Sequence, residues 1–177
     1  MKIKRKGYTV VELVIVIVVI GILATLSLMS YNNLQRRAKV SAVADGLVKV
    51  EKAFQLWAVT DQLKTWPADP YTSGGVKLQE LIDTTNLKGF LSTPPAVQGV
   101  QTQDWFYDND PSTPKTTTCG QNYLGVNIVI RFVSDADLIL QLDQLMDDGD
   151  LNCGRIRSQD QRIFLVLSRT STVEFVK

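Results

Sequence analysis

Three carboxylates near the C-terminus form the stretch of this sequence with the clearest site chemistry. Asp147, Asp148 and Asp150 lie within one tetrapeptide, and Gly149 stands between them. Hard oxygen donors at short spacing around a glycine bend are the ligands that Ca²⁺ prefers. The spacing differs from that of an EF-hand loop, and no closing glutamate follows. The stretch therefore predicts an irregular calcium site made from Asp147, Asp148 and Asp150.

The alternative interpretation of this stretch is a polar turn without a metal. Asp-Gly pairs are common turn formers because both residues tolerate the backbone conformations that tight turns need. Arg155 and Arg157 follow closely and could neutralise the acids. The sequence alone leaves both interpretations open.

The chain has no histidine and two cysteines, Cys119 and Cys153. Without histidine, His-based triads, histidine general bases and most zinc sites are excluded, so no enzymatic activity is predicted. An even cysteine count outside the cytoplasm favours a disulfide, which would stabilise the domain by about 4 kcal/mol. Two buried thiols and a metal-binding pair are the alternatives.

Glu12 is the only charged residue between Gly7 and Met29, in a run dominated by valine and isoleucine. The uncharged residues 13–29 would span about 25 Å as a helix, and with residues 8–11 they could cross a bilayer core of about 30 Å. A carboxylate inside such a span costs a few kcal/mol unless it is paired or lies near the interface. Glu12 therefore requires a specific explanation.

The basic heptapeptide before this run, MKIKRKG, contains four cationic residues and no acid. A secretory signal peptide also begins with basic residues, but its apolar core is shorter, and the sequence around Ala24–Ser27 is a poor cleavage site. A plain membrane anchor fits the length and the basic flank but gives no reason for Glu12.

A third interpretation accounts for that charge. The residues Lys6-Gly7-Tyr8-Thr9-Val10-Val11-Glu12, followed by an apolar run with Ile20-Gly21-Ile22-Leu23-Ala24, resemble the N-terminal signature of type IV pilins and their pseudopilin relatives. The resemblance implies that prepilin peptidase cuts between Gly7 and Tyr8 and that Tyr8 is N-methylated. It also implies that Glu12 corresponds to the assembly glutamate of that family.

The resemblance also implies a partner for Glu12 in a homo-oligomeric helical filament. Cleavage would free an α-amine at Tyr8, about 6 Å from Glu12 along the helix, and Glu12 could meet the amine of a neighbouring subunit. Removing either charge would leave the other buried and unpaired, at a cost of about 3–5 kcal/mol. Many pilins have a helix-kinking proline where this chain has Met29, which leaves Gly21 and the cluster Thr25, Ser27 and Ser30 as the weak points of the helix.

Other expectations follow from the same resemblance. The precursor would be a single-pass protein of the cytoplasmic membrane, handled by the inner-membrane assembly machinery, and then part of an extracellular pilus or a periplasmic pseudopilus. Many pilins tie down the edge of the head with a C-terminal disulfide, in agreement with Cys119 and Cys153. Some members carry Ca²⁺ in a comparable C-terminal loop.

The length and charge of the chain fit one modest domain behind the N-terminal segment. The net charge is +1, but the leader holds four of the nineteen basic residues and none of the eighteen acids. The remaining side chains therefore carry a net charge of −3. No basic stripe with interleaved aromatic residues is present, and no nucleic-acid partner is expected.

The predicted fold is α+β, with a long N-terminal helix packed against a small antiparallel C-terminal sheet, as in pilins. We expect a leader at 1–7, a helix at 8–61 whose residues 8–29 are transmembrane or filament core, and a head at 62–177. Within the head, 62–121 is expected as a variable loop and 122–177 as the sheet region. One apolar stripe of the helix, spaced by fours and threes, should pack on the sheet; its members are Val43, Leu47, Val50, Phe54 and Trp57.

The strands are expected where apolar residues alternate or run together. These segments are 123–133, 138–145 (ambiguous with a helix), 162–168 and 173–176, and a short helix is expected at 78–82. In the triplet 105–107, alternation would turn Trp105 and Tyr107 to the same face.

The sequence thus predicts a structural subunit of a type IV pilus-like filament. One alternative is a pseudopilin of a type II secretion or DNA-uptake machine. A second, from another class, is a membrane-anchored binding ectodomain that does not polymerise.

Overall fold

The computed structural model describes residues 7, 9–69, 75–97, 99–116, 122–131, 133, 135–159, 161–168 and 173. The chain separates into two compact units, residues 1–38 and 39–177, and each is described by itself.

Helix α1 runs from Val10 to Thr60, 51 residues, and confirms the long helix predicted from the absence of proline in this stretch. At 1.5 Å per residue it is about 75 Å long. In the first unit, every large apolar side chain of α1 whose burial the structure describes is exposed, from Val14 at 47% to Val10 at 81%. By length and composition, α1 is the one helix among the described residues that could cross a membrane.

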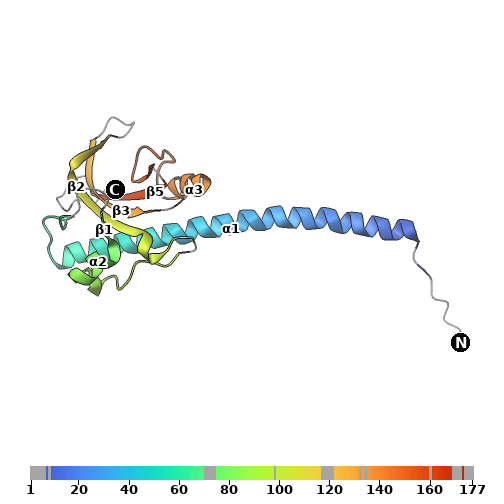
Figure 1. Ribbon diagram of the computed structural model, residues 1–177, viewed down its shortest axis with the longest axis horizontal. Coiled ribbons are helices and arrows are strands. Elements are labelled where there is room, and N and C mark those ends of the chain that lie inside the picture. The colour runs from blue at the N-terminus through green and yellow to red at the C-terminus, as the bar shows by residue number, and fades with distance from the viewer. Residues whose placement is uncertain are drawn as a thin grey trace. The chain divides into compact units, whose positions relative to one another are not determined.

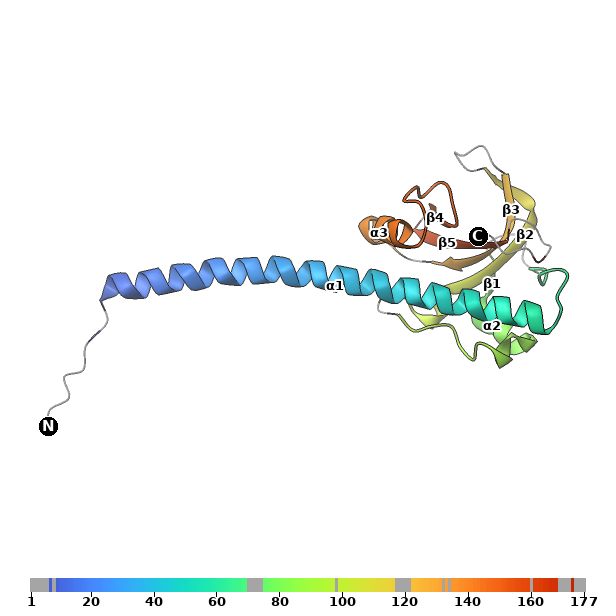
Figure 2. The same cartoon turned by 180° about the vertical axis from the view of Figure 1, so that it is seen from behind.

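The second unit is built on a five-stranded antiparallel sheet, seen from two sides in Figures 1 and 2. The strands lie in the order β1-β2-β3-β5-β4. Their bounds are β1 Val76–Lys77, β2 Trp105–Thr116, β3 Asn122–Ile130, β4 Ile156–Gln159 and β5 Arg162–Ser168. Two short helices complete the unit, α2 (Leu78–Thr84) and α3 (Ala136–Met146), with 3₁₀ turns at Asn86–Gly89 and Thr102–Asp104. The predicted α+β fold is confirmed.

The core of this unit lies between the C-terminal part of α1 and one face of the sheet. The predicted helix stripe is buried throughout, with no member more than 3% exposed. Trp105 and Tyr107 of β2 enter the same core, as strand alternation predicted, whereas Phe106 packs on the opposite face with Val129 and Phe164. Phe54 stacks on Tyr107 with ring centroids 5.6 Å apart.

A hydrogen-bonded link holds the segment after α1 to the sheet. The Tyr107 hydroxyl and the Asn109 side-chain amide both donate to the carbonyl oxygen of Pro67, each at 2.7 Å. Burial raises the pKa of the Tyr107 phenol, so this group is neutral at any physiological pH. The two bonds join residues that are 40 and 42 positions apart in the chain, so no local sequence pattern predicts them.

The prediction of a strand over residues 138–145 is wrong, because this segment is helix α3. The Asp135 carboxylate caps its first turn and accepts a hydrogen bond from the backbone N–H of Leu138 at 3.0 Å. Leu138, Ile139 and Leu142 are all buried. A helix places these three side chains on one face, whereas a strand would turn Leu138 and Ile139 to opposite faces.

Besides the two-residue strand β1, two longer strands lie outside the segments predicted as strands. β2 falls inside 62–121, the range expected as a variable loop, and its polar residues follow a three-residue aromatic start. β4 is four residues long, and only its first residue is aliphatic. Both strands are stabilised by their neighbours β3 and β5 rather than by strong patterns of their own. Of the segment 173–176, all but Val173 lies outside the described residues.

Candidate functional site

The first candidate site is the start of α1, where the processing and assembly residues were predicted. Gly7 is exposed, and Tyr8 lies outside the described residues. The Glu12 Oε2 atom accepts two hydrogen bonds from Thr9, one from its backbone N–H and one from its hydroxyl, both at 2.8 Å. The Glu12 N–H donates back to the Thr9 hydroxyl at 3.3 Å.

This reciprocal arrangement is a helix capping box, in which Thr9 is the cap and Glu12 the third helical residue. Two otherwise unpaired backbone N–H groups receive an acceptor in this way, and the Glu12 carboxylate receives donors close to the helix start. The role of Thr9 was not predicted, although the spacing Thr-x-x-Glu before an apolar run is the sequence signal for a capping box. Glu12 thus has a local structural role as well as the predicted one in assembly.

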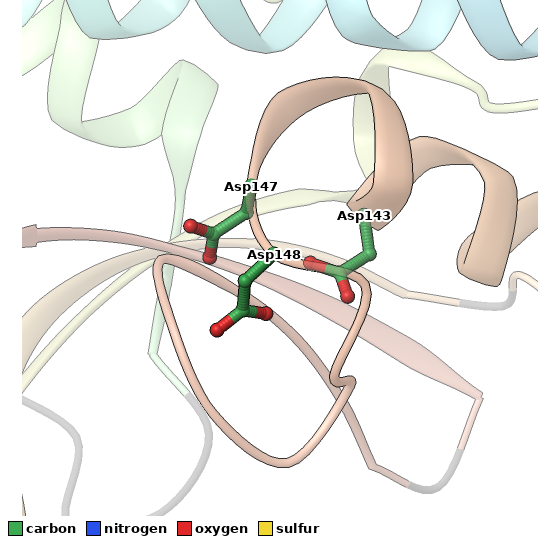
Figure 3. A group of neighbouring side chains, drawn as sticks. All are labelled: Asp143, Asp147 and Asp148. Atoms are coloured by element: carbon green, nitrogen blue, oxygen red, sulfur yellow. The ribbon is translucent and has the colours of Figure 1, made fainter.

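The second candidate site is an acidic cluster at the C-terminal end of α3, drawn in Figure 3. Its members are Asp143, Asp147 and Asp148. One carboxylate oxygen from each of the three residues lies within 4.8 Å of the other two. Asp143 is buried, Asp147 half-buried and Asp148 exposed. The structure thus brings together two of the three predicted calcium ligands, Asp147 and Asp148, and adds Asp143.

Asp150, the third predicted ligand, is not part of this group. Its Oδ1 atom accepts from the backbone N–H of Asn152 at 3.0 Å and from the Asn152 side-chain amide at 3.3 Å. Asp143 was not among the predicted ligands, because residues 138–145 were predicted as a strand and are a helix. In a helix, the four-residue spacing of Asp143 and Asp147 places both on one face, and that spacing was the available signal.

Asp147 is held by the backbone that follows it. Its own N–H ends α3 by donating to the carbonyl of Asp143 at 2.7 Å. Its Oδ2 atom accepts from the backbone N–H groups of Arg155 and Ile156, the second at 3.0 Å. Gly154 makes this approach possible, since a Cβ atom there would lie 2.0 Å from that Oδ2 atom. The loop 147–156 therefore closes on its own first residue.

The electrostatics of the cluster centre on Asp143. The pKa of Asp143 is raised to about 6, first by burial and then by the carboxylates of Asp147, Asp148 and Asp150. The backbone N–H of Gly149 acts in the opposite direction but falls short of hydrogen-bond geometry. Every charged group that shifts this pKa is itself an acid, so the cluster concentrates negative charge.

The two arginines that could neutralise the cluster make other contacts. The Arg155 guanidinium forms a partly buried ion pair with Glu51 of α1. Arg157 donates from Nε and Nη2 to the carbonyl of Gly154, at 2.9 and 2.6 Å. The Arg155 contact joins the loop to α1 within the second unit.

Of the predicted disulfide residues, Cys153 is half-buried in this loop and is not a free thiol. Cys119 lies outside the described residues, so the pairing with Cys119 is not tested here.

A basic heptapeptide, then a helix with an apolar first part and a second part packed on a small antiparallel sheet, is the arrangement of prepilin-like proteins. Comparisons with known proteins agree. Residues 2–28 match the family described as the prokaryotic N-terminal methylation motif. A type IV major fimbrial protein FimA of Dichelobacter nodosus is 30% identical over 131 residues, covering 69% of this chain and 75% of that protein. The chain belongs to the type IV pilin family.

Other relatives match over a shorter range. A second FimA of Dichelobacter nodosus and that of strain VCS1703A are each 46% identical over 50 residues, which is 27% of this chain and 31% of those proteins. No solved structure matches the chain significantly.

Proposed function

We propose that this chain is the structural subunit of a type IV pilus-like filament, made as a single-pass membrane precursor and processed between Gly7 and Tyr8. In this proposal the leader is 1–7, the helix 8–61 anchors and later assembles the subunit, and 62–177 is the exposed head. Prepilin peptidase and the inner-membrane assembly machinery would be the partners before assembly. The protein is then the substrate of the peptidase and has no catalytic role.

The observation that carries the proposal is the apolar surface of the first half of α1. From residue 10 to 28 every described side chain is exposed, and Glu12 is the one charge among them. An apolar surface of this extent is stable in water only if lipid or other protein covers it. Copies of the same helix would cover it in a filament, and the membrane would cover it before assembly.

Glu12 decides between a filament subunit and a plain anchor. An anchor needs at most the local capping role of Glu12, which glutamine also fills. A filament subunit needs the negative charge, because the neighbour's α-amine would otherwise be buried without a partner.

Substitutions at residues 9 and 12 separate the two roles. We expect Glu12→Gln and Glu12→Val to be inserted and processed normally but to lose most filaments. Thr9→Val, which removes the side-chain cap and keeps the charge, should still form filaments. The measurements are electron microscopy of the sheared surface fraction and the intact mass of the membrane-bound protein. Normal filaments from Glu12→Gln would show that the charge is not required.

The relatives named as major fimbrial proteins favour an extracellular pilus over a pseudopilus. Surface filaments whose main subunit, by mass spectrometry, begins at methylated Tyr8 would support the pilus. Filaments confined to the periplasm would support a pseudopilin, and a monomer that keeps its leader would support a membrane-anchored ectodomain.

We further propose a Cys119–Cys153 disulfide in the head. Secretion to an oxidising compartment and the half-buried position of Cys153 support it. Peptide mapping without reduction tests it, because the linked peptides appear only if the bond exists.

A further inference from the structure

Asp143 is a carboxylate that the fold buries without giving it a partner. Its exposed fraction is 0%, and neither of its side-chain oxygens accepts a hydrogen bond from any described residue. Burying a polar group without such bonds costs free energy, and a charged group costs more. The side chains that share the cluster with it, Asp147 and Asp148, are acids as well and supply no compensating charge.

The other two carboxylates of the cluster lie close to that of Asp143. One oxygen of each of Asp143, Asp147 and Asp148 lies within 4.8 Å of the others, a separation that a single ion in their midst can bridge (Figure 3). The Oδ2 atom of Asp147 accepts from the N–H groups of Arg155 and Ile156, which fixes the orientation of its carboxylate. Asp148 accepts from the Asp150 N–H through Oδ1 at 2.9 Å, so its orientation is also restricted.

We infer that the end of α3 binds a divalent cation of the calcium type through Asp143, Asp147 and Asp148. Three carboxylates supply up to six hard oxygens, and Ca²⁺ accepts six to eight oxygens in irregular geometry, with water completing the shell. Thiols and imidazoles are absent from the group, so zinc and the softer transition metals do not fit. The site lies wholly in the second unit and does not depend on filament assembly.

This set of ligands differs from the one that the sequence predicts. It replaces Asp150 of the loop with Asp143 of the helix, so the ion would join α3 to the loop that follows it. The two sets make opposite predictions for one pair of matched substitutions. Asp143→Asn and Asp150→Asn each remove one negative charge, but only Asp143→Asn should remove a ligand.

The test uses the full chain purified in detergent micelles, with Ca²⁺ as the probe. We expect calorimetric titration to give one Ca²⁺ per chain. At a free concentration of about 100 times Kd, the melting temperature should rise by roughly 5–10 °C above its value in chelator. Mg²⁺ at the same concentration should give a smaller rise, because its demand for octahedral geometry is stricter.

The variants make the test specific. Asp143→Asn should weaken Ca²⁺ binding at least tenfold and should abolish the melting shift. In chelator it should melt no lower than the unsubstituted protein, because it removes an unpartnered buried charge. Asp148→Asn, at an exposed position, should also weaken binding at least tenfold without a folding defect. Asp150→Asn should weaken it only a few-fold, through the loss of nearby charge.

Three results would overturn the inference. The first is a melting temperature of the unsubstituted protein that is equal in chelator and in about 10 mM Ca²⁺, above the usual Kd range of extracellular calcium modules. The second is unchanged affinity in Asp143→Asn, and the third is an equal response to Mg²⁺. None of these results would bear on filament formation, which the Glu12 variants test separately.

Discussion

The ion pair between Glu51 and Arg155 joins α1 to the loop 147–156, called the acidic loop below. The two residues are 104 positions apart in the chain, and their side chains are 16% and 24% exposed. The pair is therefore partly shielded from water. An exposed pair on the same helix, Lys49 with Asp45, is 64% and 63% exposed and is four residues apart.

These two pairs make a matched comparison. Alanine double-mutant cycles should give a coupling free energy of about 1–3 kcal/mol for Glu51–Arg155, since charged hydrogen bonds away from water are strong. The exposed Asp45–Lys49 pair should give about 0.5 kcal/mol or less. Unfolding of the full chain in detergent, followed by tryptophan fluorescence, measures both. Equal couplings would mean that the partial burial of Glu51–Arg155 has no energetic effect.

At the scale of elements, the sequence predicted the parts that depend on local pattern. The length of α1 and its buried stripe, β3, β5 and the short helix α2 all follow from periodicity and from the positions of proline and glycine. In the candidate site, Glu12 was found because a lone charge in an apolar run stands out. Asp147 and Asp148 were found because acids cluster around Gly149.

What the sequence did not predict depends on distant residues. Apolar residues in 138–145 alternate well enough for a strand. The segment is a helix because Asp135 caps it and because its apolar residues pack into the core. β2 contains aspartates and prolines, and it is a strand because β3 pairs with it at Trp105–Asp110 and again at Lys115–Thr116. Asp143 could not be assigned to the cluster until α3 was known to be a helix.

At the scale of elements, the closure of the acidic loop depends on Gly154. Its φ of +71° is unfavourable for any residue with a side chain, and its missing Cβ leaves room for Asp147. We expect Gly154→Ala to destabilise the second unit by about 1–3 kcal/mol, because it adds strain and displaces a carboxylate that accepts two backbone hydrogen bonds.

Gly89→Ala is the matched control for Gly154→Ala. A Cβ atom at Gly89 meets no heavy atom within 4 Å, and its φ is not positive. The melting temperature of this variant should stay close to that of the unsubstituted protein, while that of Gly154→Ala should fall by several degrees. Similar melting temperatures for the two variants would contradict the role given to loop closure.

At the scale of the whole molecule, the proposed function assigns separate roles to the two units. The first unit presents an apolar helix surface with a capped glutamate at its start. The second unit has its own core and its own candidate ion site. Substitutions in the first unit should therefore change processing and assembly without changing the stability of the head.

Gly7 tests this separation most directly. It is exposed, and a Cβ atom there meets no heavy atom within 4 Å, so Gly7→Val does not disturb any described packing. If the peptidase requires a small residue before the cut, this variant keeps the heptapeptide MKIKRKV in place. The α-amine at Tyr8 is then never formed, and Glu12 has no partner in a filament.

We therefore expect Gly7→Val to accumulate in the membrane with its leader attached, to form few or no filaments, and to melt at the same temperature as unprocessed protein of the natural sequence. Intact mass, electron microscopy and thermal unfolding in detergent measure these three properties. Gly21→Val, which adds the same side chain at an open position of α1 beyond the cut, should still lose the leader. A Gly7→Val protein that assembles with its leader in place would show that the free amine is not what Glu12 binds, and the filament contact would have to be sought elsewhere on the helix.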